Sequence, residues 1–208
     1  IYKAPLAELL EQVRNGQIVD ALGNSAVDPS TGFFRRGTQS FWSATPDEDR
    51  VTDGGAASQL PDPATRNVYT YLPASGNRNL TAPVNAISAS NTALTDALLG
   101  TGGPGPTREQ VIDWARGVDI QDVDANGNIT EAAKRMGDPL HARPALVSFG
   151  GALDTPDPRD VVVLVPTNDG VLHAFDARSG AELWSFVPPE LLSRLRQLVE
   201  DRPQNPRS

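Results

Sequence analysis

Cysteine is absent from this 208-residue chain, and lysine occurs only as Lys3 and Lys134. Without cysteine the chain can form no disulfide, no thiolate metal site and no thiol nucleophile. No segment approaches the ~20 consecutive apolar residues that a membrane-spanning helix needs, and residues 1–15 lack the charged and apolar regions of a signal peptide. We therefore expect no membrane-spanning segment, and a chain that begins after any targeting sequence.

Positive charge is also scarce. The net charge is −8 and the isoelectric point is near 4.7, so the basic footprint that binds nucleic acid is missing. Divalent cations are the electrostatic partners that such a chain favours. The sequence has no Gly-x-Ser-x-Gly, no His-Glu-x-x-His and no phosphate-binding loop. We therefore predict no nucleic-acid partner and no enzymatic activity.

What the chain does have is turn chemistry, with 18 Gly and 18 Pro, which is typical of β architecture with many loops. Its clearest pattern is a set of three short strands joined by two tight turns at residues 168–170 and 176–180. The predicted strands are Val161–Val165, Val171–Phe175 and Glu182–Val187. Alternation in the third strand places Trp184 and Phe186 on one face, where they could pack against a neighbouring blade.

Capping residues and apolar periodicity predict four short helices. They are expected over residues 5–14, over 92–99 with Asn91 as N-cap, over 107–115 with a Thr107/Gln110 capping box, and from Pro189 onward. Small strands are expected around Ile18, Phe34 and Trp42, with a clearer strand over Val68–Leu72. Residues 101–106, TGGPGP, are predicted to be a linker.

The three-strand segment resembles the quinoprotein-type repeat, in which Asn-Asp-Gly, Ala-Phe-Asp, a closing Gly and Leu-Trp follow one another. Upstream, residues 136–144 read MGDPLHARP and resemble a signature of the PilC/PilY family of type IV pilus assembly factors and tip adhesins. Further similar segments precede it and occur in the same order as in the family. They are residues 16–21, 41–43, 54–57, 66–72, 94–100 and 114–117. The resemblance covers nearly the whole chain.

This resemblance implies a mainly β fold, a partial quinoprotein-like β-propeller with several short inserted helices. One module over residues 1–208 is expected: opening strands, long loops and a helix near 92–99 in 1–100; a linker, helix and acidic loop in 101–135; the first clear blade and a C-terminal helix in 136–208. A propeller needs at least ~4 blades, so we expect a fragment of a longer chain.

The resemblance also implies a function. The expected partners are minor pilins, the pilus and secretin machinery, and a host or abiotic surface. The expected location is extracellular, on the cell surface, at the pilus tip or associated with the outer membrane. Calcium-binding loops in this family govern pilus extension and retraction, and with them surface attachment and twitching motility. A calcium-responsive binding and assembly module is therefore our first hypothesis.

Residues 122–130, DVDANGNIT, are the strongest chemical signal. Oxygen side chains at positions 1, 3 and 5, Gly at 6 and an apolar residue at 8 match the start of a calcium loop. The predicted ligands are Asp122, Asp124, Asn126, Asn128, Thr130 and Glu131. Ile129 is expected to anchor the loop in the core.

The loop departs from the calcium pattern at position 12, where Ala133 replaces a bidentate glutamate. Glu131, Asp119 or a distant carboxylate could complete the shell. The alternative is a metal-free Asn-Gly turn on an acidic surface. The second acidic run, residues 47–53, lacks a well-placed Gly, and we interpret it as a solvated loop.

The two histidines, His141 and His173, lie on different elements and are interpreted as structural, with His173 bonded to a neighbouring strand. Two further hypotheses stay open beside the pilus module. One is a fragment of a quinoprotein dehydrogenase that uses pyrroloquinoline quinone. The other is a purely structural scaffold propeller.

Overall fold

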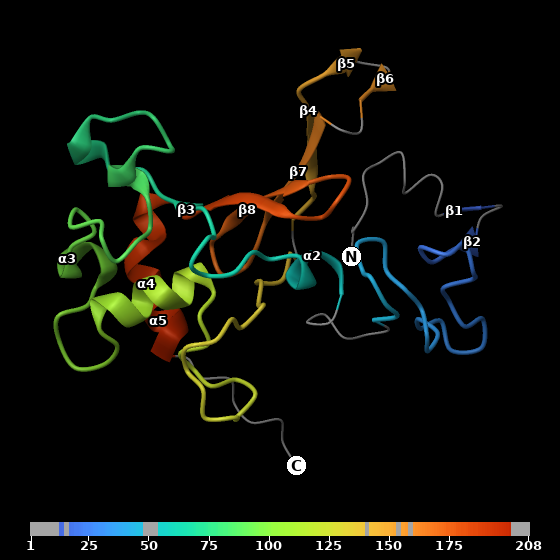
Figure 1. Cartoon of the computed structure of the whole chain (residues 1–208), viewed down its shortest axis with the longest axis horizontal. Coiled ribbons are helices and arrows are strands. Elements are labelled where there is room, and N and C mark those ends of the chain that lie inside the picture. Colours follow the sequence, from blue (N-terminus) through green and yellow to red (C-terminus); the bar gives the residue numbers. More distant parts are fainter. Residues whose placement is uncertain are drawn as a thin grey trace. The chain divides into compact units, whose positions relative to one another are not determined.

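The largest sheet of the protein has five strands and is mixed (Figure 1). The computed structural model describes residues 13–14, 17–47, 54–139, 142–152, 155–157 and 160–200. The strand order is β3 (Val68–Tyr69), β9 (Glu182–Phe186), β8 (Leu172–Asp176), β7 (Val161–Pro166) and β4 (Ala145–Ser148). β4 runs antiparallel to β7, whereas β3 runs parallel to β9.

The chain also forms smaller strands, short helices and 3-10 turns. Two pairs of two-residue strands are antiparallel: β1 (Val13–Arg14) with β2 (Gln17–Ile18), and β5 (Gly151–Ala152) with β6 (Thr155–Pro156). The helices are α2 (Gly55–Ser58), α3 (Asp96–Leu99), α4 (Arg108–Arg116) and α5 (Leu192–Glu200), with 3-10 turns η1 (Pro73–Ser75), η2 (Pro83–Asn85) and η4 (Pro189–Leu191). No helix in the described ranges is long and apolar enough to cross a bilayer.

The three strands predicted over residues 161–187 are confirmed, with β8 starting one residue later than expected. The second turn shows why the pattern is specific. The Asp176 carboxylate accepts hydrogen bonds from the backbone N–H of Ser179 at 2.7 Å and of Arg178 at 3.1 Å. Burial raises the pKa of Asp176, but the hydrogen bonds from the Ser179 hydroxyl and from these two N–H groups together outweigh that effect, so the net pKa lies below its usual value.

The aromatic residues of β9 are less buried than the alternation suggests. Trp184 and Phe186 are half-buried, Leu183 is 41% exposed, and the buried residues of the strand are Glu182 and Ser185. A mainly β arrangement with short helices is therefore what the described residues contain. The propeller stays a prediction.

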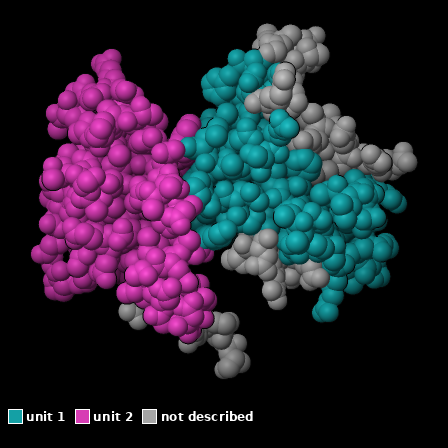
Figure 2. All heavy atoms as spheres, viewed as in Figure 1, with its two compact units in different colours: residues 1–61, 134–166, 173–183 teal, residues 62–133, 167–172, 184–208 magenta. Residues whose placement is uncertain are grey.

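The chain divides into two compact units, each built from several segments (Figure 2). Unit 1 comprises residues 1–61, 134–166 and 173–183, and its core is Trp42, Leu60, Val161, Val163, Val165, Phe175 and Ala177. The strand predicted around Trp42 is wrong, because this residue lies in a turn. Its indole N–H donates to the carbonyl of Ala177 at 3.1 Å, and its ring lies 6.2 Å from that of Phe175.

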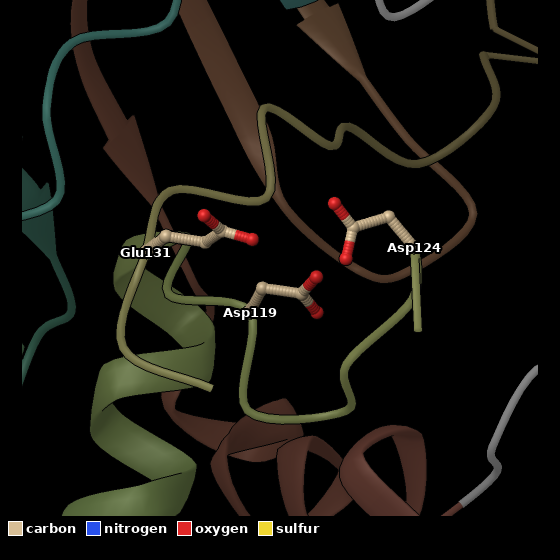
Figure 3. Close-up of side chains that lie close together, drawn as sticks. All are labelled: Asp119, Asp124 and Glu131. Carbon is tan, nitrogen blue, oxygen red and sulfur yellow. The ribbon is translucent and has the colours of Figure 1, made fainter. Parts of the chain in front are cut away.

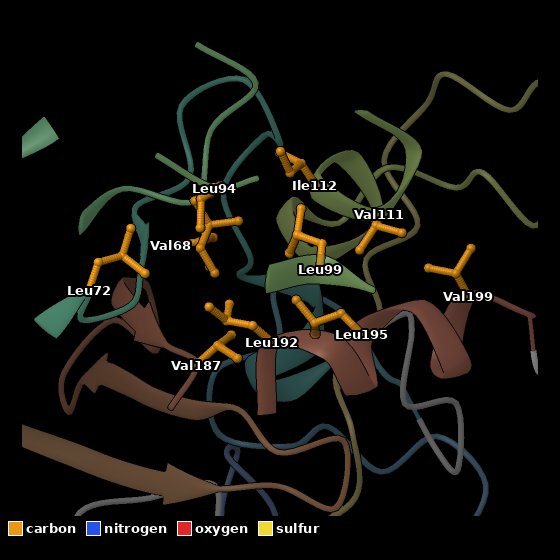
Figure 4. Packing of buried hydrophobic residues seen from close by; sticks show 11 residues of the cluster. Val68, Leu72, Leu94, Leu99, Val111, Ile112, Val187, Leu192, Leu195 and Val199 are labelled. Carbon is orange, nitrogen blue, oxygen red and sulfur yellow. The ribbon is translucent and has the colours of Figure 1, made fainter. Parts of the chain in front are cut away.

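Unit 2 comprises residues 62–133, 167–172 and 184–208 and has a separate core (Figure 4). Its buried members are Val68, Leu72, Ile87, Leu94, Leu99, Val111, Ile112, Val187, Leu192, Leu195 and Val199. Helices α3, α4 and α5 contribute most of them, so three short helices share one apolar interior. This unit carries the acidic loop.

Two predicted helices have their expected signals. In α4 the Thr107 hydroxyl accepts from the N–H of Gln110 at 3.2 Å, and the Gln110 side chain accepts from the N–H of Thr107 at 2.9 Å. The helix ends at Gly117, whose φ of 97° favours glycine. The last helix, α5, follows the 3-10 turn that Pro189 begins.

The other helix predictions need correction. α3 begins at Asp96 with Thr95 as its cap. The Asn91 side-chain oxygen accepts from the N–H of Ala93 at 3.1 Å, but a turn and not a helix follows it. Leu98 on α3 is 40% exposed. The helix predicted over 5–14 is wrong at its end, where Val13 and Arg14 form β1, and its other residues lie outside the described ranges.

Three arginines hold loops of unit 2 by donating to backbone carbonyls. Arg108 donates to Ala89, Asn91 and Leu94, Arg116 to Pro63, Ala64 and Ile87, and Arg196 to Gly100 and Pro104. Each guanidinium has several N–H donors in a fixed plane, so one side chain can satisfy several loop carbonyls.

His173 is bonded to a neighbouring strand, as predicted. Its Nδ1 lies 2.7 Å from Oε1 of Glu182 on β9, and both side chains are buried. The ring stacks on Phe175 with centroids 5.7 Å apart. The other histidine, His141, lies outside the described residues.

We predict that Gly180→Ala destabilises unit 1. Gly180 has φ of 74°, and an added Cβ would overlap the indole of Trp42. The left-handed conformation costs an alanine about 1 kcal/mol, and the overlap adds about 1–3 kcal/mol. Gly23→Ala is the matched control, because its φ is 83° with nothing within 4 Å. Urea unfolding monitored by tryptophan fluorescence should show the larger loss for Gly180→Ala; equal losses would contradict the contact.

Candidate metal centre

The acidic loop is closed at its base by a short antiparallel contact. Val118 and Ala132 form a bridge, the N–H of Asp119 donates to the carbonyl of Glu131 at 2.8 Å, and the N–H of Ala133 donates to that of Gly117 at 2.9 Å. The base directly follows the C-terminal end of α4. Two acidic residues far apart in the sequence are thereby fixed beside one another.

Inside the loop, side-chain oxygens bind backbone N–H groups two residues further on. The N–H of Asn126 donates to Asp124, that of Asn128 to Asn126, and that of Thr130 to Asn128, at 3.2, 2.7 and 3.1 Å. Such turns are what Asp and Asn form most readily. Gly127, with φ of 85°, donates its N–H to Asp122 at 3.0 Å, so the Gly at position 6 takes the turn conformation that the pattern requires.

Three carboxylates converge in this loop (Figure 3). Asp119, Asp124 and Glu131 each offer one oxygen, and these oxygens all lie within 4.8 Å of one another. Asp119 is only 5% exposed and accepts from the N–H of Val123 at 3.0 Å, whereas Glu131 is half-buried and Asp124 exposed. Burial and hydrogen bonding therefore hold Asp119 in place, whereas Asp124 is accessible to solvent.

Asparagine amides separate the carboxylates. The amide nitrogen of Asn126 donates to Asp124 at 2.9 Å and to Glu131 at 2.6 Å, and that of Asn128 donates to Glu131 at 3.2 Å. These donors partly offset the negative charges of the carboxylates. Rotating either amide by half a turn would present its carbonyl oxygen instead.

The structure groups some of the predicted ligands and not others. Asp124 and Glu131 lie together with Asp119, which the sequence analysis named as an alternative ligand. Asp122 is outside this group of three, and its carboxylate bonds to Gly127. The Thr130 hydroxyl donates to the side chain of Asn128 at 2.8 Å.

The anchoring role predicted for Ile129 is wrong, because this side chain is 47% exposed. The backbone pairing at the base holds the loop in its place. The second acidic run also differs from expectation at Asp47, which is 2% exposed and accepts from the N–H of Ser40 at 2.7 Å. The rest of that run, residues 48–53, lies outside the described residues.

The donor set fits a hard divalent cation. All available groups are carboxylate, amide or backbone oxygens, which calcium and magnesium prefer, and calcium tolerates the irregular geometry of such a loop. The described group contains no histidine, so it lacks the softer ligands typical of zinc or copper.

We predict that Asn126→Asp lowers the melting temperature in EDTA and that calcium reverses the loss. The substitution removes the donor between Asp124 and Glu131 and adds a like charge. A cost of about 1 kcal/mol would shift the melting temperature by roughly 2–4 °C. Asn77→Asp is the control, because Asn77 is exposed and uses only its side-chain oxygen, toward Asn79. Equal shifts in the two variants, measured by calorimetry, would contradict the arrangement.

No family model and no solved structure matches the chain. Among curated proteins it is similar to the type IV pilus biogenesis factor PilY1 homolog of Xylella fastidiosa (strain Temecula1), 31% identical over 108 residues, 44% of this chain and 9% of that protein. It is also similar to the type IV pilus biogenesis factor PilY1 of Pseudomonas aeruginosa (strain UCBPP-PA14), 26% identical over 161 residues, 66% of this chain. The chain spans 9–13% of the length of these relatives. Over this short part, both similarities indicate a PilY1-like family.

Proposed function

We propose that this chain is a calcium-responsive binding and assembly module of a type IV pilus biogenesis factor, without enzymatic activity of its own. The observation that carries the calcium part is the convergence of Asp119, Asp124 and Glu131 within 4.8 Å. The pilus part is supported by the two partial similarities to pilus biogenesis factors. Pilus extension and retraction, surface attachment and twitching motility are the processes that it would serve.

Gln121 links the acidic loop to helices α4 and α5 of unit 2, so cation binding in the loop could alter the packing of these helices. The side-chain nitrogen of Gln121 donates to the carbonyls of Leu198 and Val199 at the end of α5, at 3.2 and 3.0 Å. Its oxygen accepts from the indole N–H of Trp114 on α4 at 3.0 Å. Ordering the loop would therefore stiffen the contact between these two helices.

Calcium binding would replace hydrogen-bond donors by a charge. The amides of Asn126 and Asn128 would release the carboxylates and could turn their oxygens inward, while the backbone at the loop base keeps Asp119 and Glu131 in position. Because the base is already formed, most of the ordering cost falls on the exposed half of the loop. A weak site that responds to extracellular calcium concentrations fits this geometry.

The partners proposed for the whole protein are minor pilins, the pilus and secretin machinery, and a host or abiotic surface, with a location on the cell surface at the pilus tip or outer membrane. The blade-like pattern of β7, β8 and β9 supports a propeller completed by further sequence. In such proteins, specificity resides in loops held by a rigid sheet.

We predict measurable calcium affinity, with a dissociation constant on the order of 10⁻⁴ to 10⁻³ M. In isothermal titration, Asp119→Asn with Asp124→Asn should weaken binding by about tenfold or more, because two of the three converging charges are lost. Asp62→Asn, an exposed aspartate outside the group, should have no effect. Absence of heat with the wild-type chain would contradict the proposal. So would an absorbance change on adding pyrroloquinoline quinone, which favours a dehydrogenase.

The pilus role is tested in a bacterium that carries the full-length protein. With Asp119→Asn and Asp124→Asn in the chromosomal copy, the amount of surface pilin released by shearing should no longer depend on calcium, whereas Asp62→Asn should leave that dependence intact. Normal calcium dependence in the double variant, with the protein present at wild-type levels, would separate the loop from pilus assembly.

A further inference from the structure

A short hairpin in unit 1, residues 27–36, presents aromatic and basic side chains on its second arm. Val27 pairs antiparallel with Phe34, and the N–H of Asp28 donates to the carbonyl of Phe33 at 2.9 Å. The Asp28 carboxylate accepts from the N–H and hydroxyl of Ser30 at 2.8 and 2.6 Å. Local hydrogen bonds thus fix the hairpin.

The side chains of residues 33–36 on this arm are exposed. Phe33 is 76% exposed and Phe34 45%, and the next two residues, Arg35 and Arg36, are exposed as well. Arg35 donates from Nε to the carbonyl of Val27 at 3.1 Å. Hydrogen bonds from Ser30 lower the pKa of the Asp28 carboxyl, and the nearby charge of Arg35 lowers it as well. Two rings and two guanidinium groups therefore lie on four successive exposed residues.

An exposed phenylalanine pair calls for a partner, and the adjacent charges select its kind. At the surface of a bilayer, aromatic rings lie at the level of the headgroups and arginines bind phosphates through paired donors. Arg35 and Arg36 outweigh Asp28, the one carboxylate of this segment. Anionic lipid complements the resulting positive charge in an otherwise acidic chain.

We propose that the hairpin of residues 27–36 docks onto anionic phospholipid surfaces, with Phe33 entering the interface and Arg35 and Arg36 contacting phosphates. Contact is weak and reversible. A single myristoyl chain gives an association constant of only about 10⁴ M⁻¹, and two partly exposed rings offer less apolar area. The net charge of −8 opposes approach, so binding depends on low salt and on anionic lipid.

This inference extends the surface-attachment part of the proposed function but does not depend on calcium. The hairpin belongs to unit 1 and the acidic loop to unit 2. The assay is therefore done in EDTA, so that calcium cannot bridge lipid and protein. A failed vesicle assay leaves the calcium titration unaffected, and a failed titration leaves the vesicle assay unaffected.

The test is co-sedimentation of the chain with vesicles of equimolar phosphatidylglycerol and phosphatidylcholine, compared with phosphatidylcholine alone. The chain should bind only the anionic vesicles, and raised salt should release it. Arg36→Gln should weaken binding about fivefold, the effect of one basic residue near such a surface, and Phe33→Ser should weaken it by a similar factor or more. Neither side chain is buried, so both variants should fold, which circular dichroism checks.

Matched controls come from the same chain. Phe149→Ser removes a ring with the same 76% exposure, and Arg78→Gln removes an exposed arginine elsewhere; neither should change binding. Equal losses in these controls would show non-specific adhesion and overturn the proposal. Binding to neutral vesicles, no binding at all, or concentration-dependent self-association that Phe33→Ser abolishes would overturn it too, the last by assigning the hairpin to a second copy of the chain.

Discussion

The acidic loop depends on one short piece of backbone pairing, between residues 117–119 and 131–133. This contact fixes Asp119 beside Glu131, although like-charged carboxylates repel one another. The repulsion is offset by amide donors from Asn126 and Asn128. The pairing in turn rests on α4, because Gly117 both ends that helix and begins the strand-like contact.

The loop and the helices of unit 2 thus form a continuous structure. The capping box of Thr107 and Gln110 sets where α4 begins, and Gly117 sets where it ends. Gln121 then joins the first residues of the loop to α5. The similarity to pilus biogenesis factors gives this arrangement a biological setting, while the chemistry of the loop gives it a candidate signal.

Local signals in the sequence predicted local structure well. The β7–β8–β9 segment has period-two alternation and strong turn residues, and the capping box of α4 needs only four consecutive residues. The N-cap of α3 could not be predicted in the same way, since Asn91 and Thr95 are both good caps. Both side chains accept a backbone N–H, Asn91 from Ala93 and Thr95 from Leu98, but only the second of these turns continues as a helix. The amide of Asn91 also donates to Val84 and Ala86, which only the folded chain brings into reach.

The candidate site shows the same limit. Asp124 and Glu131 belong to a recognisable linear pattern, but the inclusion of Asp119 follows from the pairing at the loop base, which has no short-range signal. The expectation that Ile129 is buried was wrong. In calcium loops that lie between two helices, the residue at this position packs into the core. Here α4 precedes the loop and no helix follows it before residue 139, so no apolar surface receives that side chain.

The arginine contacts of unit 2 bear on the ionic strength at which it can work. Arg108, Arg116 and Arg196 hold loops through carbonyl dipoles more than through carboxylates, and interactions with partly buried dipoles are screened by salt far less than surface ion pairs. A lysine ammonium could not reach several carbonyls in one plane. The folding of unit 2 should therefore depend little on ionic strength, because these arginine contacts persist at salt concentrations that weaken surface ion pairs.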